Sequence, residues 1–305
     1  MGPASASART AAPETVTCGE VITHSIVLAN DLSCSFGQTV LTVGADHITI
    51  NLAGHTLQGI FGPALSSAGR RYVTIENGSL GDNAIALRVT GDRHDTVRNL
   101  VAAGGGEGSG ASFSGGSYNR VLDSTLLSGP GFAPLELENE SEDVVAGNTA
   151  ISQQGLKIGP GGGDRVVRNT TSTVDVTGSG NLIEANVMTP VPPAVAGLVI
   201  EGDQNRVIRN HVSSGLAGGQ VVQFLEGISV TGSDNALGAN TAVDSAGDGI
   251  HILTADNRVT ANVANDNGAF GIEAVPGVID GGRNRASGNG TPAQCLNIDC
   301  SASEW

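Results

Sequence analysis

The chain has 305 residues, 45 of them glycine, a formal net charge of −15 and 3% aromatic residues. So much glycine, with a single lysine, argues against a helix-rich enzyme and for a fold with many tight turns. The negative charge argues against a nucleic-acid partner, and no apolar run approaches the roughly 18 residues that a membrane span needs.

The two ends of the chain are distinguished by small residues and by cysteines. The opening MGPASASARTAAPETVT resembles the segment that follows a removed secretion signal. The four cysteines form two close pairs, Cys18 with Cys34 and Cys295 with Cys300, which predicts one local disulfide near each end. Zinc binding is the alternative, but the pairs lack CxxC spacing. We therefore expect a secreted or cell-envelope protein.

A six-residue motif recurs between residues 119 and 289. It has Asn or Asp first, an aliphatic residue two places later and, usually, Asn five places later, as in NRVIRN at 205–210 and NRVTAN at 257–262. The eight motifs start at Asn119, Asp143, Asp164, Asn181, Asn205, Asn235, Asn257 and Asn284. Their sixth residues are Ser124, Asn148, Asn169, Asn186, Asn210, Asn240, Asn262 and Asn289.

The motif spacing predicts a solenoid. Starts lie 17 to 30 residues apart, which fits coils that turn the same corner and carry loops of varying length at another. Leucine-rich and helical repeats are disfavoured because their periodic patterns are missing. Short alternating runs such as ISVTG and IHILT predict strands of three to five residues. We expect an all-β, right-handed parallel β-helix of about ten coils, in which Asn adopts the left-handed turn and stacks in a column.

Looser copies occur upstream, in HITINLAGHTLQG at 47–59 and YVTIENGSLG at 72–81. Together with CGEVITHSIVLANDLSC at 18–34 and the NRVxxN coils, they resemble secreted right-handed parallel β-helix repeat proteins from GC-rich bacteria. The resemblance implies an architecture similar to that of pectate lyases, polygalacturonases and alginate epimerases. We expect a flexible segment at 1–17, the β-helix at 18–294 and a disulfide-closed end at 295–305.

One strand of each coil reads apolar–x–apolar, which places its middle residue outside. Across successive coils these middle residues predict one outward column: Glu136, Lys157, Asp175, Val199, Ser229, His251 and Glu273. Two interpretations stay open. The column is an ordinary polar surface, or Lys157 between Glu136 and Asp175 forms an acid–base group, with Ser229 and His251 as further catalytic candidates.

The loops before these strands carry apolar residues, which predicts either a lid packed on the coils or the lining of a ligand cleft. The candidate substrate-binding residues are Phe132, Met188, Val191, Leu216, Val222 and Phe224. No cofactor and no metal site are predicted. Calcium binding by Asp244, Asp248 and Asp266 is a weaker alternative, and GDGIHI at 247–252 is interpreted as a glycine turn entering a strand.

Three functions remain open. Our main hypothesis is a cofactor-free cyclase or isomerase that holds an apolar, polyketide-like small molecule in a reactive conformation, with Lys157, Ser229 or His251 stabilising negative charge. The first alternative, implied by the resemblance, is a lyase, epimerase or hydrolase of acidic polysaccharides. The second is a secreted binding protein without catalysis.

Overall fold

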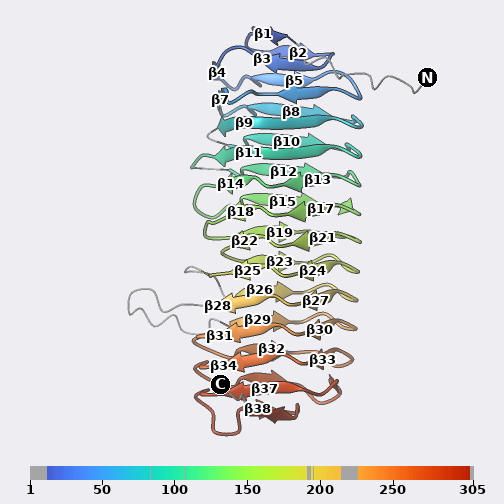
Figure 1. Cartoon of the computed structure of the whole chain (residues 1–305), viewed down its shortest axis with the longest axis vertical. Helices are drawn as coiled ribbons and strands as arrows, with labels where there is room; N and C mark the ends of the chain where they lie inside the picture. Colours follow the sequence, from blue (N-terminus) through green and yellow to red (C-terminus); the bar gives the residue numbers. More distant parts are fainter. Residues whose placement is uncertain are drawn as a thin grey trace, which may run out of the picture.

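The structure is a computed structural model that describes residues 12–82, 84–106, 108–190, 194, 196–213 and 226–302. All elements in these ranges are β-strands, and they pair in parallel from coil to coil along one long stack (Figure 1). The predicted parallel β-helix is confirmed. It has about 12 coils, close to the predicted ten. The described residues include no helix that is long and apolar enough to cross a membrane.

Each complete coil has three faces. Face 1 is a sheet of thirteen strands: β2 (Glu20–Ile22), β5 (Leu41–Val43), β8 (Leu65–Ala68), β10 (Leu87–Thr90), β12 (Ala111–Ser114), β15 (Leu135–Glu138), β19 (Leu156–Ile158), β23 (Val174–Val176), β26 (Ala196–Ile200), β29 (Glu226–Val230), β32 (Ile250–Ile252), β35 (Ile272–Ala274) and β38 (Cys295–Leu296).

Faces 2 and 3 form one sheet, because the long strands β9 (Thr74–Asp82) and β11 (Thr96–Gly104) bend across both. Face 2 also contains β1 (Pro13–Glu14), β3 (Ile26–Leu28), β6 (Thr49–Asn51), β13 (Arg120–Leu122), β17 (Val144–Ala146), β21 (Arg165–Val167), β24 (Leu182–Glu184), β27 (Arg206–Ile208), β30 (Ala236–Gly238), β33 (Arg258–Thr260) and β36 (Ile279–Asp280).

The remaining strands lie on face 3 or at a corner. Face 3 contains β4 (Leu32–Phe36), β7 (Thr56–Ile60), β14 (Thr125–Leu127), β18 (Thr149–Ala150), β22 (Thr170–Thr171), β25 (Val187–Met188), β28 (His211–Ser213), β31 (Thr241–Val243), β34 (Val263–Asn265), β37 (Asn284–Ser287) and β39 (Cys300–Ser301). The small strands β16 (Glu140–Ser141) and β20 (Gly161–Gly162) pair between faces 1 and 2.

The core fills the space between the three faces. Strand alternation explains it, since Leu156 and Ile158 point inward and are fully buried while Lys157 between them is exposed. The same alternation repeats from coil to coil, so each aliphatic side chain packs on its counterparts above and below. Complete burial of each contributes about 1.5–3 kcal/mol relative to an exposed side chain. The stack is therefore held together along its whole length.

The recurring Asn residues form hydrogen-bonded ladders at the corners. Between faces 2 and 3, the backbone N–H of Asn186 donates to Oδ1 of Asn210 at 3.0 Å. The Asn186 amide also donates to that oxygen at 3.0 Å and to the carbonyl of Val166 at 2.8 Å. A second ladder lies between faces 1 and 2, where the N–H of Asn205 donates to Oδ1 of Asn235 at 2.7 Å. The predicted stacking of Asn amides is confirmed.

The prediction that Asn adopts the left-handed turn holds at Asn77 (62°) and Asn99 (51°) in the upstream coils but is wrong for the Asn residues of the ladders. At these corners the residue before each Asn has the positive φ, as in Arg168 (55°), Ala185 (55°) and Ala261 (56°). A left-handed conformation costs a non-glycine residue roughly 1–2 kcal/mol. The Asn side chain that follows offsets that cost by satisfying buried backbone groups of adjacent coils.

The motif that starts at Asn284 lies one corner later in its coil than the other seven motifs do. The N–H of Asn262 donates to Oδ1 of Asn284, so Asn284 belongs to the ladder between faces 2 and 3. Asn289 instead receives the N–H of Asn267 at the corner between faces 3 and 1. Successive corners lie five residues apart in these coils, as Asn257, Asn262 and Asn267 are, so the motif alone does not identify its corner.

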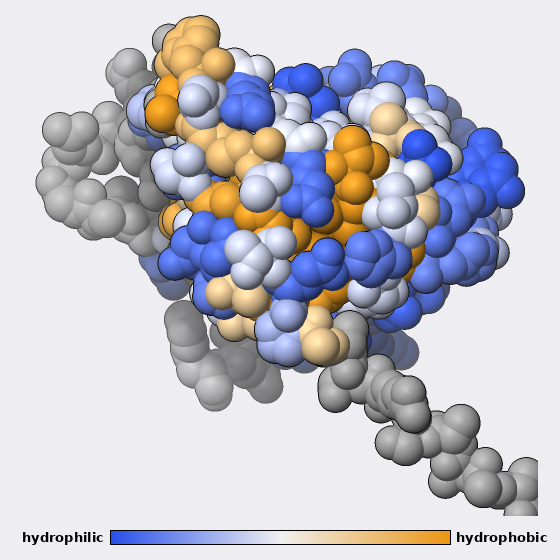
Figure 2. All heavy atoms as spheres, turned by 90° about the horizontal axis from the view of Figure 1, so that it is seen from above, coloured by the Kyte–Doolittle hydropathy of each residue, from blue (hydrophilic) through white to orange (hydrophobic). Residues whose placement is uncertain are grey.

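The ends of the stack carry the cysteines. Seen from the N-terminal end, hydrophobic residues lie at the centre and reach one edge at the upper left, while hydrophilic residues dominate the right-hand side (Figure 2). Strand β1 lies within the segment 1–17 that the sequence analysis placed outside the β-helix, and it pairs with β3. Both predicted disulfides, Cys18–Cys34 and Cys295–Cys300, are present.

The two disulfides are expected to differ in their effect on stability. Their cysteines are 16 and 5 residues apart, so the loss of loop entropy in the unfolded chain predicts contributions of about 3 and about 2 kcal/mol. Urea unfolding of the C18S/C34S and C295S/C300S double variants measures these values. A larger effect of the C-terminal pair would contradict this account.

Candidate functional site

The outward column predicted on face 1 is present. Strand register pairs Glu136 with Lys157 and Lys157 with Asp175, and Ser229 pairs with His251, which pairs with Glu273. Val199 joins the two halves. The predicted catalytic residues therefore lie on one line along the stack, spaced about 4.8 Å per coil.

Lys157 does not form the compact acid–base group that its neighbours suggested. In the described part of the chain no ion pair links it to Glu136 or Asp175, although both flank it in register. Burial and the nearby Glu201 raise the pKa of Asp175, and Lys157 opposes that shift. Oδ1 of Asp175 is buried and has no hydrogen-bond partner among the described residues.

A cleft of about 310 Å³ lies beside Asp175. Its described lining combines polar groups with small apolar ones: Gly131, Gln153, Gln154, Thr173, Val174, Asp175, Ala194, Ala196 and Val199. The unpartnered carboxylate oxygen and the glutamine amides give this cleft the groups that hydrogen-bond to hydroxyl-rich ligands.

The predicted apolar wall is only partly accounted for. Phe132 is 37% exposed and follows Gly131 of the cleft. The prediction that Met188 lines a substrate site is wrong, because its side chain is fully buried in the core. Asn186 points inward and Val187 outward, so alternation along β25 turns Met188 inward, where it pairs in register with Val212. Val191, Leu216, Val222 and Phe224 lie outside the described residues.

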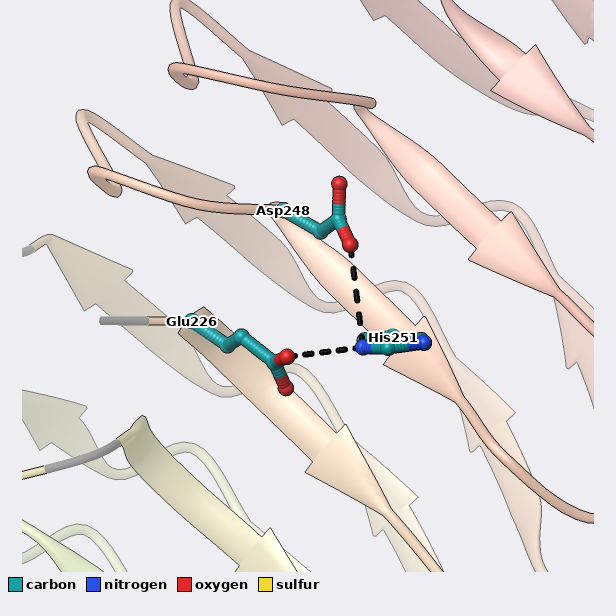
Figure 3. A group of neighbouring side chains, drawn as sticks. All are labelled: Glu226, Asp248 and His251. Carbon is teal, nitrogen blue, oxygen red and sulfur yellow. Dashed lines mark hydrogen bonds and ion pairs between the residues drawn. The ribbon is translucent and has the colours of Figure 1, made fainter. Parts of the chain in front are cut away.

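Among the described residues of face 1, the closest grouping of titratable side chains surrounds His251. Its Nδ1 lies 2.7 Å from Oε1 of Glu226 and 3.6 Å from Oδ2 of Asp248. Figure 3 shows the imidazole with one ring nitrogen toward the two carboxylates and the other directed away from them. Glu226 thus holds the imidazole ring through Nδ1, and Nε2 remains directed away from both carboxylates.

Two glycines explain how the acids reach this position. Glu226 and Asp248 each precede a glycine and an isoleucine, at the start of β29 and just before β32. A Cβ on Gly227 would lie 2.4 Å from the carbonyl oxygen of Gly249, and one on Gly249 would lie 2.5 Å from Nδ2 of Asn267. Since only glycine fits between such closely packed coils, the two glycines allow adjacent coils to approach closely at the strand entrance, next to each acid.

Electrostatics favour a shared proton at this site. The hydrogen bond to Glu226 raises the pKa of His251, and Asp248 and Glu273 add to the shift while burial opposes it. Burial raises the pKa of Asp248 to about 6, with Glu273 contributing. The 2.7 Å contact is a direct hydrogen bond, too short for a metal ion to lie between its two atoms at normal ligand distances. The geometry therefore suits proton transfer better than metal binding.

Glu226 was not predicted, and Asp248 was considered only as a calcium ligand. A sequence signal exists in LEGISV and GDGIHI, because each places an acid before Gly–Ile and three residues before the outward residue of its strand. That offset identifies a second outward position, which brings Glu226 beside His251 once the coils are in register.

Comparisons with known proteins support the architecture. No protein-family model and no curated sequence matches the chain. The catalytic domain of a GH87 α-1,3-glucanase in complex with tetrasaccharides matches in structure, with a TM-score of 0.61 and 13% identity over 97% of this chain and 70% of that chain. The shared property is the fold. The A-module of mannuronan C-5 epimerase AlgE4 from Azotobacter vinelandii has a TM-score of 0.62 and 13% identity over 93% and 90%. A DFA-IIIase from Arthrobacter chlorophenolicus in complex with DFA-III has a TM-score of 0.50 and 13% identity over 96% and 72%.

Proposed function

We propose that this protein is a polysaccharide-modifying enzyme that transfers a proton through Nε2 of His251, in a lyase or epimerase reaction on a uronate-containing chain. The observation that carries the proposal is the imidazole whose Nδ1 is held by Glu226 at 2.7 Å while its other nitrogen faces away. A base fixed by a carboxylate in this way has the geometry of general-base catalysis.

The reaction begins at the carbon next to the uronate carboxylate. Neutral Nε2 takes the proton from that carbon, and the electron pair moves into the carboxylate group as an enediolate. In elimination, the pair expels the glycosidic oxygen at the neighbouring carbon, a carbon–carbon double bond forms, and the leaving oxygen takes up a proton from the imidazolium or from water. In epimerisation, the same carbon accepts a proton from water on the opposite face, and the imidazolium returns its proton to solvent. Glu226 keeps the Nδ1 proton in place throughout.

Glycoside hydrolysis fits the cluster less well. A hydrolase needs two carboxyl groups on either side of the scissile bond, and an inverting enzyme separates them by about 6.5–9.5 Å to admit a water. Here the ligand atoms of Glu226, Asp248 and His251 all lie within 4.8 Å of one another, and both acids face the same imidazole nitrogen. The acids are placed to orient His251.

A polymeric substrate is supported by the length of the site. The cleft at Asp175 lies three coils from His251, or about 14 Å along face 1. A small molecule would not reach both, whereas an extended sugar chain advances by about one ring per coil. The matching glucanase and epimerase structures add support for a carbohydrate substrate.

The cyclase hypothesis is weakened, because Met188, one of its predicted substrate-binding residues, is buried in the core. The comparisons give that hypothesis no support. Two disulfides support an extracellular setting.

The proposal predicts exchange of a carbon-bound proton. The protein is incubated in D2O with mannuronan, polygalacturonate, hyaluronan and a neutral α-glucan, and NMR follows deuterium incorporation next to the carboxylate together with any unsaturated product. We expect incorporation in at least one uronate polymer and none in the glucan. New reducing ends without deuterium or unsaturation would instead identify a hydrolase, and the proposal would fail.

A further inference from the structure

A line of arginines runs along face 2. Its outward column alternates arginine with a smaller apolar residue from coil to coil: Arg120, Val144, Arg165, Leu182, Arg206, Ala236, Arg258 and Ile279. The strands that carry it lie one below another along one side of the stack (Figure 1). We call Arg120, Arg165, Arg206 and Arg258, which are all exposed, the arginine stripe.

The stripe has no acidic partners within the described ranges. None of its four guanidinium groups forms an ion pair there, and the corner acids Glu142, Asp234 and Asp256 make none either. Two arginines close to the stripe are neutralised, because Arg98 of β11 pairs with Glu76 at 2.6 Å and Arg209, at the corner after β27, pairs with Glu184 at 2.8 Å. In a chain with a net charge of −15, four aligned unpaired guanidiniums mark a surface for an anion.

The distance between consecutive arginines of the stripe indicates which kind of anionic polymer fits it. Two coils separate consecutive arginines, so the positive charges recur about every 9.6 Å along a straight line. A sugar chain in which every second ring carries a carboxylate presents its charges at a similar interval, and guanidinium groups bind carboxylates well. Nucleic acid fits poorly, since phosphates follow one another every 3.4 Å along a strand that winds around the duplex.

We propose that face 2 binds an extended acidic polysaccharide with alternating uronate residues, through the arginine stripe. Apolar Val144, Leu182 and Ala236 between the arginines leave space for the uncharged rings. This surface is separate from the His251 site on face 1, and its binding does not depend on turnover there. It would hold the protein on an acidic polymer.

Hyaluronan oligosaccharides, whose uronates alternate with uncharged sugars, provide the probe. We compare the wild type with R165Q/R206Q, which removes two stripe charges, and with R98Q/R209Q, which removes the charges of the two paired arginines close to the stripe. Titration calorimetry at low salt is expected to show binding that weakens about tenfold in R165Q/R206Q and less than about twofold in R98Q/R209Q.

Three results would overturn the proposal. These are no binding of hyaluronan to the wild type, equal weakening in both double variants, which would reduce the effect to net charge, and binding of duplex DNA as tight as that of hyaluronan. Circular dichroism confirms that both variants are folded. Deuterium exchange at the His251 site is expected to be unchanged in R165Q/R206Q, so failure of the stripe and failure of the proposed enzyme activity are distinguishable.

Discussion

Replacing His251 with glutamine is expected to lower the rate of deuterium exchange by about 10²- to 10⁴-fold, the range typical of general acid–base catalysis. Glutamine can still hydrogen-bond to Glu226 but cannot accept the proton. The matched control is His211→Gln, which makes the same change at an exposed position on face 3. Similar rates in the two variants would show that His251 is not the base.

The pH profile tests the role of Glu226 as a positioning residue. Glu226 is the main cause that raises the pKa of His251. Since the neutral imidazole is the active form, exchange by the wild type should increase as the pH rises through a value above 6.5, the ordinary pKa of His251. In Glu226→Gln this rise is expected at lower pH, because the stabilisation of the imidazolium is lost. A merely structural role would lower the rate without moving the profile.

The fold could be predicted because its signals are local. An apolar–x–apolar strand fixes which side chains point inward, and an Asn at a corner satisfies backbone groups of the next coil whatever the loop length. Hence Glu136, Lys157, Asp175 and His251 were correctly placed on one line. The coil register follows from the same pattern except at the motif that starts at Asn284, whose corner the pattern did not identify.

The candidate site was harder to predict, because it depends on contacts between coils at positions outside the strand alternation. Glu226 lies 25 residues before His251 and meets it only because adjacent coils stack in register. The arginine stripe was visible as the recurring Arg in the second position of the motif, at Arg120, Arg165 and Arg206 for example. Its meaning required the register, which shows that these arginines occupy alternate coils, and the ion pairs, which show which arginines are free.

Replacing Asn186 with alanine is expected to lower the free energy of unfolding by about 3–5 kcal/mol, a large effect for one substitution. Asn186 is fully buried in the ladder between faces 2 and 3. Its Oδ1 accepts the backbone N–H and the side-chain amide of Asn169, both at 2.9 Å, and its own amide donates to the Val166 carbonyl. Alanine would leave these groups buried without partners.

Two further variants separate the ladder from simple loss of volume. Asn186→Asp keeps the shape and the acceptor oxygen but loses the amide donors, so it too is expected to be strongly destabilising, because a carboxylate oxygen would face Val166 O and Asn210 Oδ1. Val187→Ala is the control, since Val187 is the adjacent residue and is 43% exposed; a change within about 0.5 kcal/mol is expected. Urea unfolding followed by circular dichroism measures all three. If Asn186→Asp were as stable as the wild type, the amide donors would contribute nothing, and the stability of the stack would have to be attributed to its aliphatic core.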